Sequence, residues 1–245
     1  MRSNYRLAGH VISLQSQYPL VHRMCAPYQT EEAEEMAIVT TDADIAFEKE
    51  RSAREYLREN LREGIPHYAP DYLETLAVYR KLAEAYLAYD MLLVHGSVVA
   101  VDGQAYLFTA SSGTGKTTHT RLWLERFGQR AQVVNGDKPL LGIGPQGVTA
   151  YGTPWDGKEH LSSNIACPLK AICILTRGET NRIAPISKKD ALPMLCQQTY
   201  RPMNPAALRK TLSLVDRLGG LVALYRLSCN MEPEAAQVAY DGMNR

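Results

Sequence analysis

The sequence predicts an α/β core preceded by a smaller α+β module, and three observations support this prediction. From residue 91 onward, short apolar runs alternate with helix-like segments. A glycine-containing segment at residues 110–117 lies between one such run and a helical pattern. The composition also changes near Asp90, from charged helical stretches to strand-like runs. We therefore expect an accessory module over residues 1–90 and the core over residues 91–245.

The first 90 residues predict two strands and two helices. We expect strands at 5–14 and 38–40, and a solvated helix that begins near Thr41 and Asp44 and extends to about Arg62. Gly64 and Pro66 then predict a break. A second helix is expected over 71–90. Its predicted core face carries the spaced residues Tyr72, Leu76, Tyr79, Ala83 and Tyr86.

The core segment predicts two hairpins, further strands and several helices. Asp102-Gly103 between apolar runs predicts a hairpin over 91–110, and a second hairpin is expected at 140–151. We expect further strands at 131–134, 171–176, 182–186 and 221–227, and helices at 118–127, 187–200, 204–218 and 233–243. Gly219-Gly220 should end the third of these helices.

The composition excludes several classes of protein. Lysine plus arginine number 27 against 26 acidic residues, for a net charge of +1, so we expect no nucleic-acid partner. No apolar run is long enough for a membrane helix, and the first residues do not form a signal peptide. The five cysteines are scattered, which predicts neither disulfides nor a zinc site and favours the cytoplasm.

Residues 110–117 read A-S-S-G-T-G-K-T, which differs from the P-loop pattern G-x-x-x-x-G-K-[ST] only by Ala110 in place of the first glycine. In such a loop, backbone amides and the helix N-terminus bind phosphates. We expect Lys116 to reach the outer phosphates of ATP and Thr117 to ligate Mg²⁺. The residues expected to contact ATP are Ser112, Gly113, Thr114, Gly115, Lys116, Thr117 and Thr118.

Two further segments carry candidate site residues. Asp137 follows the apolar run that ends at Val134, where P-loop proteins place an acid for the metal. Residues 152–160 gather Asp156, Lys158, Glu159 and His160 beside a tryptophan. This composition fits either a substrate loop, with Lys158 and His160 binding the acceptor, or a charged turn whose Trp155 packs inward.

The stretch V-H-G-S-V-V-A-V-D-G-Q-A-Y-L-F-T-A, followed by S-S-G-T-G-K-T-T, resembles HPr kinase/phosphorylase. It is also similar to the nucleotide core of ATP-dependent phosphoenolpyruvate carboxykinase. A weaker resemblance links the chain to HPr-kinase-related proteins of peptide-modifying gene cassettes, including lasso-peptide kinases. The resemblance implies a mixed sheet with flanking helices, and it places His95 near the terminal phosphate or metal. The families' Asp-Asp pair is reduced here to Asp137, flanked by Gly136 and Lys138.

Three functions remain open from the sequence. The first is an ATP- and Mg²⁺-dependent kinase that phosphorylates a hydroxyl, for example a serine of a protein or peptide. The second is a small-molecule kinase, and the third is a nucleotide-dependent regulatory module without catalysis. For catalysis, we expect Asp137 to hold the metal and either Asp156 or Glu159 to act as the base. The sequence does not name the acceptor, and it leaves open whether the chain forms a homo-oligomer.

Overall fold

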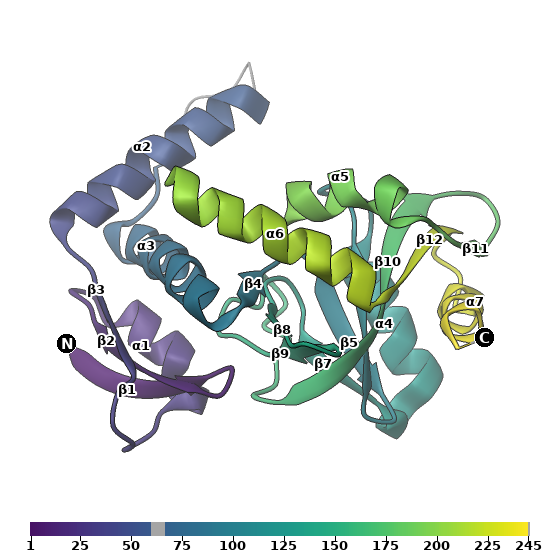
Figure 1. Ribbon diagram of the computed structural model, residues 1–245, viewed down its shortest axis with the longest axis horizontal. Coiled ribbons are helices and arrows are strands. Elements are labelled where there is room, and N and C mark those ends of the chain that lie inside the picture. Colours follow the sequence, from purple (N-terminus) through teal and green to yellow (C-terminus); the bar gives the residue numbers. More distant parts are fainter. Residues whose placement is uncertain (60–66, 245) are drawn as a thin grey trace. The chain divides into compact units, whose positions relative to one another are not determined.

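The computed structural model describes residues 1–59 and 67–244, which divide into two compact units at residues 85 and 86 (Figure 1). The expected helix end near Arg62 and the break at Gly64 and Pro66 lie outside the described residues. In the described ranges, no helix has both the length and the apolar character of a membrane span.

The N-terminal unit contains a three-stranded sheet and three α-helices within residues 1–59 and 67–85. The strands lie in the order β1-β2-β3, with β1 antiparallel and β3 parallel to β2. The elements are β1 (Arg2–Leu7), β2 (His10–Gln15), α1 (Leu20–Cys25), a short 3₁₀ turn (Ala26–Tyr28), β3 (Met36–Val39), α2 (Asp42–Glu59) and α3 (Pro70–Ala85).

The expectation of one continuous strand over residues 5–14 was wrong, because the chain reverses at Ala8 and Gly9. Both residues have positive φ angles, 48° and 84°, which the tight turn between β1 and β2 requires. An Ala-Gly pair is a weak turn signal beside Asn-Gly or Asp-Gly, so the local sequence did not indicate the reversal.

The expected core face of α3 was also wrong at its start. Tyr72 is 44% exposed, whereas Leu73, Ala77 and Leu82 are buried. The orientation of the helix follows from Glu74, which is fully buried and accepts hydrogen bonds from the backbone nitrogens of Gln17 (2.7 Å) and Tyr18 (2.8 Å). A buried carboxylate with these partners rotates the helix so that Tyr72 faces outward.

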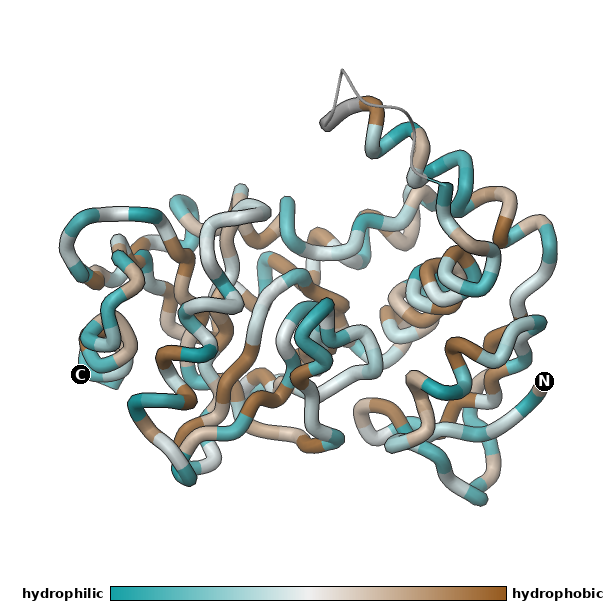
Figure 2. The backbone as a smooth tube through the Cα atoms, turned by 180° about the vertical axis from the view of Figure 1, so that it is seen from behind, coloured by the Kyte–Doolittle hydropathy of each residue, from teal (hydrophilic) through white to brown (hydrophobic). Residues whose placement is uncertain are grey.

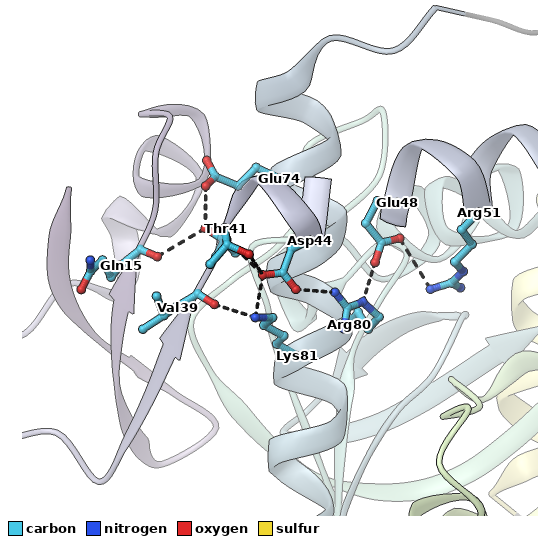
Figure 3. A network of polar contacts seen from close by, with 10 residues as sticks. Gln15, Val39, Thr41, Asp44, Glu48, Arg51, Glu74, Arg80 and Lys81 are labelled. Atoms are coloured by element: carbon cyan, nitrogen blue, oxygen red, sulfur yellow. Dashed lines mark hydrogen bonds and ion pairs between the residues drawn. The ribbon is translucent and has the colours of Figure 1, made fainter. Parts of the chain in front are cut away.

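Charged side chains join α2 to α3 in the same unit (Figure 3). Asp44 accepts hydrogen bonds from Arg80 and Lys81, each at 2.8 Å, and Arg80 also donates to the buried Glu48 at 2.6 Å. Burial raises the pKa of Asp44, but the hydrogen bonds from Lys81, Arg80 and Thr41 outweigh it and bring the pKa to about 2. Asp44 therefore stays ionised at neutral pH.

The C-terminal unit is built on a mixed sheet, as the sequence resemblance implied. Its strands lie in the order β4-β8-β9-β10-β6-β5-β7, and β12 joins β10 and β11. The strands are β4 (Met91–Leu93), β5 (Ser97–Val101), β6 (Gln104–Thr109), β7 (Ala131–Asn135), β8 (Leu140–Ile143), β9 (Val148–Tyr151), β10 (Ala166–Arg177), β11 (Arg182–Pro185) and β12 (Ala223–Cys229). The expected β8–β9 hairpin is confirmed. The hairpin expected over 91–110 is formed by β5 and β6 alone, because β4 pairs with β8 instead.

Helices cover both faces of this sheet. The helices are α4 (Lys116–Phe127), α5 (Lys188–Gln198), α6 (Pro205–Leu221) and α7 (Glu234–Met243), with 3₁₀ turns at Tyr86–Tyr89 and Gly128–Arg130. Trp123 of α4 and Ala236 of α7 belong to one core cluster, and Leu195 of α5 and Leu218 of α6 belong to the other. Hydrophobic stretches run through the strands between these two layers (Figure 2).

Helices α5 and α6 begin where the sequence predicted, each behind a side-chain cap, but the predicted end of α6 was wrong. Ser187 accepts a hydrogen bond from the amide of Asp190, and Asn204 accepts from the amides of Ala206 and Ala207. Helix α6 nevertheless continues through Gly219 and Gly220 to Leu221. In this last turn Leu218 is fully buried, and a Cβ atom at Gly219 would lie 3.2 Å from Cγ of Lys188.

Candidate functional site

The strand directions bring three chain segments to one edge of the sheet. Strand β5 is antiparallel to both β6 and β7, so β6 and β7 are parallel to each other. The P-loop that follows β6 and the Gly136-Asp137 segment that follows β7 therefore emerge at the same edge, where β5 begins just after His95. Ligands of α/β proteins bind at the carboxyl ends of parallel strands.

The P-loop has the backbone that its glycines permit. Gly113 and Gly115 have φ angles of 73° and 119°, in the region that other residues rarely adopt. Gly115 is the N-cap of α4, which begins at Lys116. Thr114 turns back within the loop, where its hydroxyl donates to the carbonyl of Ser111 at 2.9 Å. The loop thus directs its amides and the start of α4 to one side.

Lys116 and Thr117 have side chains suited to a phosphate and its metal. The Lys116 ammonium donates to the carbonyl of Ala110 at 3.1 Å. Burial lowers the pKa of Lys116, and the charge of Asp137 partly offsets this effect. The Thr117 hydroxyl is exposed and has no hydrogen bond to any described residue. The Lys116 ammonium is therefore available to a phosphate, and the Thr117 hydroxyl is available to a metal bound with it.

His95 and Asp137 lie within hydrogen-bond distance of each other at the same edge. The Nε2 atom of His95 lies 3.1 Å from Oδ1 of Asp137, and the Lys138 ammonium lies 3.7 Å from Oδ2. Burial raises the pKa of Asp137, but the hydrogen bond from His95 and the charges of Lys138, His95 and Lys116 outweigh it, so the pKa lies below its ordinary value. Asp137 is therefore a carboxylate suited to a cation.

The backbone around His95 leaves no room for a side chain at the next position. The amide of Gly96 donates to the carbonyl of Asp137 at 2.9 Å, and a Cβ atom at Gly96 would lie 2.9 Å from the carbonyl oxygen of Phe108. The Thr109 hydroxyl donates to the carbonyl of His95 at 3.0 Å. His95 is thus fixed between the start of the P-loop and the Asp137 segment.

Asn135 positions the Asp137 segment, and sequence reasoning did not identify it. The side chain is fully buried, and its Oδ1 accepts hydrogen bonds from the amides of Asp137 (2.9 Å) and Lys138 (2.6 Å). Its Nδ2 donates to the carbonyl and hydroxyl oxygens of Thr153 at 3.0 and 3.1 Å. One amide therefore joins the end of β7 to the start of the 152–160 segment.

The 152–160 segment packs against the Asp137 segment. The amide of Gly136 donates to the carbonyl of Leu161 at 2.8 Å, and a Cβ atom at Gly157 would lie 3.1 Å from Cβ of Asp137. Trp155 is buried, as the charged-turn interpretation expected, while Lys158, Glu159 and His160 are exposed. The segment therefore has an inward tryptophan and an outward charged rim.

The two candidate bases have different surroundings. Burial raises the pKa of Asp156, whose Oδ1 lies 3.3 Å from Nδ1 of the exposed His160. Glu159 forms an ion pair with Arg121 of α4. Asp156 is the more enclosed of the two carboxylates, and Glu159 fastens the segment to the P-loop helix.

A cavity of about 550 Å³ lies between these segments. The residues predicted from the sequence that line it are His95, Ser112, Gly113, Gly115, Lys116, Thr117, Thr118, Asp137, Asp156, Lys158 and Glu159. Thr114 and His160 do not line it. Arg121, which sequence reasoning also missed, lines it from α4; its charge complementarity to Glu159 is visible only once the chain is folded.

The donor set fits ATP with Mg²⁺. The P-loop offers amides, a helix N-terminus and a lysine to phosphates, and Thr117 and Asp137 offer two oxygen ligands to a metal that phosphates also coordinate. In the described residues, no three His, Cys, Asp or Glu side chains gather as a metal site. A magnesium ion here would thus be held jointly by protein and nucleotide.

Comparison with known proteins supplies a family. A search of the curated proteins found no match. Among solved structures, the Hpr(Ser) kinase/phosphatase from Coxiella burnetii is similar at 10% sequence identity and a TM-score of 0.34, over 61% of this chain and 94% of that chain. This similarity is too weak to bear on activity. Residues 71–211 match the family model described as SynChlorMet cassette protein ScmC. Since that match covers more than half of the sequence, the chain belongs to the ScmC family of SynChlorMet cassette proteins.

Proposed function

We propose that the chain is an ATP- and Mg²⁺-dependent kinase that transfers the γ-phosphate to a hydroxyl, for example a serine of a protein or peptide. The observation that carries the proposal is the cavity in which the P-loop, His95, Asp137 and Asp156 meet. It brings a phosphate-binding loop, a metal-binding carboxylate and a separate carboxylate within reach of one another.

The side chains divide the work of phosphoryl transfer. Bound Mg²⁺-ATP supplies the activated phosphoryl group. Lys116 offsets negative charge on the phosphates, and Thr117 and Asp137 hold the metal. His95 holds the Asp137 carboxylate in place through the 3.1 Å contact.

Asp156 is the better candidate for the base that accepts the hydroxyl proton. A carboxylate with a raised pKa is a stronger base, and Asp156 lines the cavity without a lysine or arginine partner among the described residues. Glu159 is engaged by Arg121, and Asp137 is committed to the metal. Of the two candidate bases that the sequence left open, Asp156 and Glu159, the proposal selects Asp156.

The acceptor side of the cavity favours a peptide over a small molecule. A small-molecule kinase would enclose its acceptor around Lys158, but Lys158, Glu159 and His160 are all exposed. An exposed rim of charged side chains can receive a serine on a longer chain. The proposal therefore puts the acceptor segment along residues 156–160.

A transfer assay separates the three functions. The protein is incubated with Mg²⁺ and ATP labelled in the γ-phosphate, together with either a serine-containing peptide library or a set of small hydroxyl compounds. We expect label on peptides and none with Lys116→Ala. Label on small compounds alone supports the small-molecule kinase. Binding of ATP with slow turnover that neither set of acceptors stimulates supports the regulatory module.

A further inference from the structure

The side chain of Arg177 connects the end of a core strand to the P-loop. It is the final residue of β10, which runs parallel to β6 with Ile174 opposite Thr109. Its Nη2 atom donates to the carbonyl of Gly113 at 2.5 Å. Gly113 is the loop glycine with a φ of 73°, so this exposed arginine holds the P-loop at a position whose backbone conformation favours glycine.

The strand order places Arg177 on the side of the P-loop opposite His95 and Asp137. Strands lie in the order β7, β5, β6 and β10, and β12 lies beyond β10. The contact between His95 and Asp137 lies on the β5–β7 side of the P-loop. With the terminal phosphate and metal on that side, the nucleoside end of ATP lies toward the carboxyl ends of β10 and β12.

The guanidinium of Arg177 has donors left for a ligand. A guanidinium carries five N–H donors, and the contact with Gly113 is its one hydrogen bond to the described residues. Its planar cation suits both phosphate oxygens and the face of an aromatic base.

The loops behind Arg177 are braced against each other. The amide of Asn230 donates to Oδ1 of Asn181 at 3.1 Å, and Nδ2 of Asn230 donates to the carbonyl of Glu179 at 3.0 Å. The amide of Gly178 donates to the carbonyl of Cys229 at 3.0 Å. These hydrogen bonds hold the backbone that follows Arg177 in place.

We propose that Arg177 is a nucleotide-positioning residue, which holds Gly113 in its binding conformation and contacts the nucleotide on its nucleoside side. The inference rests on the proposed binding of ATP. It identifies the β10–β12 edge as the place where the nucleoside leaves the P-loop.

Calorimetry with ATP and with ADP, each in the presence of Mg²⁺, tests this proposal on the full chain. In Arg177→Gln, the Kd values for ATP and ADP should rise together by about tenfold, because one charged donor is lost on the side that both nucleotides share. The kcat at saturating ATP should stay within about twofold of wild type. Arg182→Gln is the matched control, because Arg182 is an exposed arginine of β11 with no ion pair in the described residues.

The outcomes separate this inference from the proposed function. Wild-type protein that binds neither nucleotide contradicts the proposed function itself. Wild-type binding with unchanged Kd values in Arg177→Gln overturns the role of Arg177. A loss of ATP affinity without a loss of ADP affinity overturns the assignment to the nucleoside side. Thermal unfolding without nucleotide should be the same in wild type and variant, which excludes a general loss of structure.

Discussion

The Nε2 atom of His95 lies 3.1 Å from Oδ1 of Asp137, although one residue precedes β5 and the other follows β7. The Lys138 ammonium lies near the second oxygen of the same carboxylate at 3.7 Å. Asp137 is therefore held ionised and oriented before any ligand arrives. In the proposed kinase, this arrangement prepares a metal ligand beside Lys116.

Asp137→Asn should weaken the binding of ATP in the presence of Mg²⁺ by at least about tenfold, because a neutral amide is a poorer ligand for a hard divalent cation. Without Mg²⁺, ATP should bind the variant and the wild type with similar affinity. Calorimetry with and without Mg²⁺ measures both values. Asp241→Asn on α7 is a control that should behave like wild type in both conditions. A Mg²⁺-independent loss of affinity in Asp137→Asn would contradict the metal role.

Asp156→Asn should leave the Kd for Mg²⁺-ATP near that of wild type and slow transfer to the acceptor by about 10²-fold or more. Because the pKa of Asp156 lies above its ordinary value, the wild-type rate should fall with decreasing pH earlier than for an ordinary aspartate. Glu159→Gln should slow transfer less, since Glu159 is paired with Arg121. Single-turnover transfer rates across pH check this. Full activity in Asp156→Asn would leave Asp137 or Glu159 as the base.

The paired strands and helix caps of the C-terminal unit could be predicted because their signals are local. Asp102-Gly103 marked the β5–β6 hairpin, and Ser187 and Asn204 marked the starts of two helices. The errors arose where tertiary contacts prevail. The orientation of α3 follows from buried Glu74, and α6 continues through Gly219 beside the buried Leu218.

The parts of the candidate site that are contiguous in the sequence could be predicted, and the parts that folding brings together could not. The P-loop is one uninterrupted motif, so its residues could be named directly. Asn135 and Arg177 could not be named, since their roles depend on hydrogen bonds to Thr153 and to Gly113, which are distant in the sequence. A rule that does bear on Arg177 is that polar residues at the carboxyl ends of parallel strands line ligand sites, but it requires the strand order.

Asn135→Ala should lower the free energy of unfolding by about 2 kcal/mol or more, because it leaves the amides of Asp137 and Lys138 without their buried acceptor. It should also weaken Mg²⁺-dependent ATP binding, since the Asp137 segment loses its support. Denaturant unfolding and calorimetry measure the two effects. Gln132→Ala, an exposed amide in the same strand, is the control. Unchanged stability in Asn135→Ala would show that the segment is held by other contacts.

His119, on the buried face of α4, should make the protein sensitive to acid. Burial lowers its pKa to about 4, and its Nδ1 atom has no hydrogen-bond partner among the described residues. A histidine with a folded pKa below its unfolded value binds protons more readily when unfolded, so stability falls as pH drops from about 6.5 toward 4. The free energy of unfolding should fall by about 3 kcal/mol over this range, at ~1.4 kcal/mol per pKa unit.

His119→Gln tests this dependence, since its amide oxygen can still accept the hydrogen bond from Trp123 Nε1 that His119 Nε2 accepts at 3.0 Å. Unfolding free energies measured between pH 7 and 4 should fall less steeply in the variant than in wild type. Parallel curves for the two proteins would exclude His119 as the acid-sensitive group.

The most direct test of the kinase proposal is a calorimetric titration of Mg²⁺-ATP into the wild-type protein and into Lys116→Ala. Lys116 lines the cavity at the start of α4 and makes its one hydrogen bond to a described residue at the Ala110 carbonyl. We predict saturable one-site binding by wild type, a loss of affinity in Lys116→Ala, and a fall in turnover of about 10²-fold or more. Equal binding of Mg²⁺-ATP by the two proteins, or no binding by either, would contradict the account.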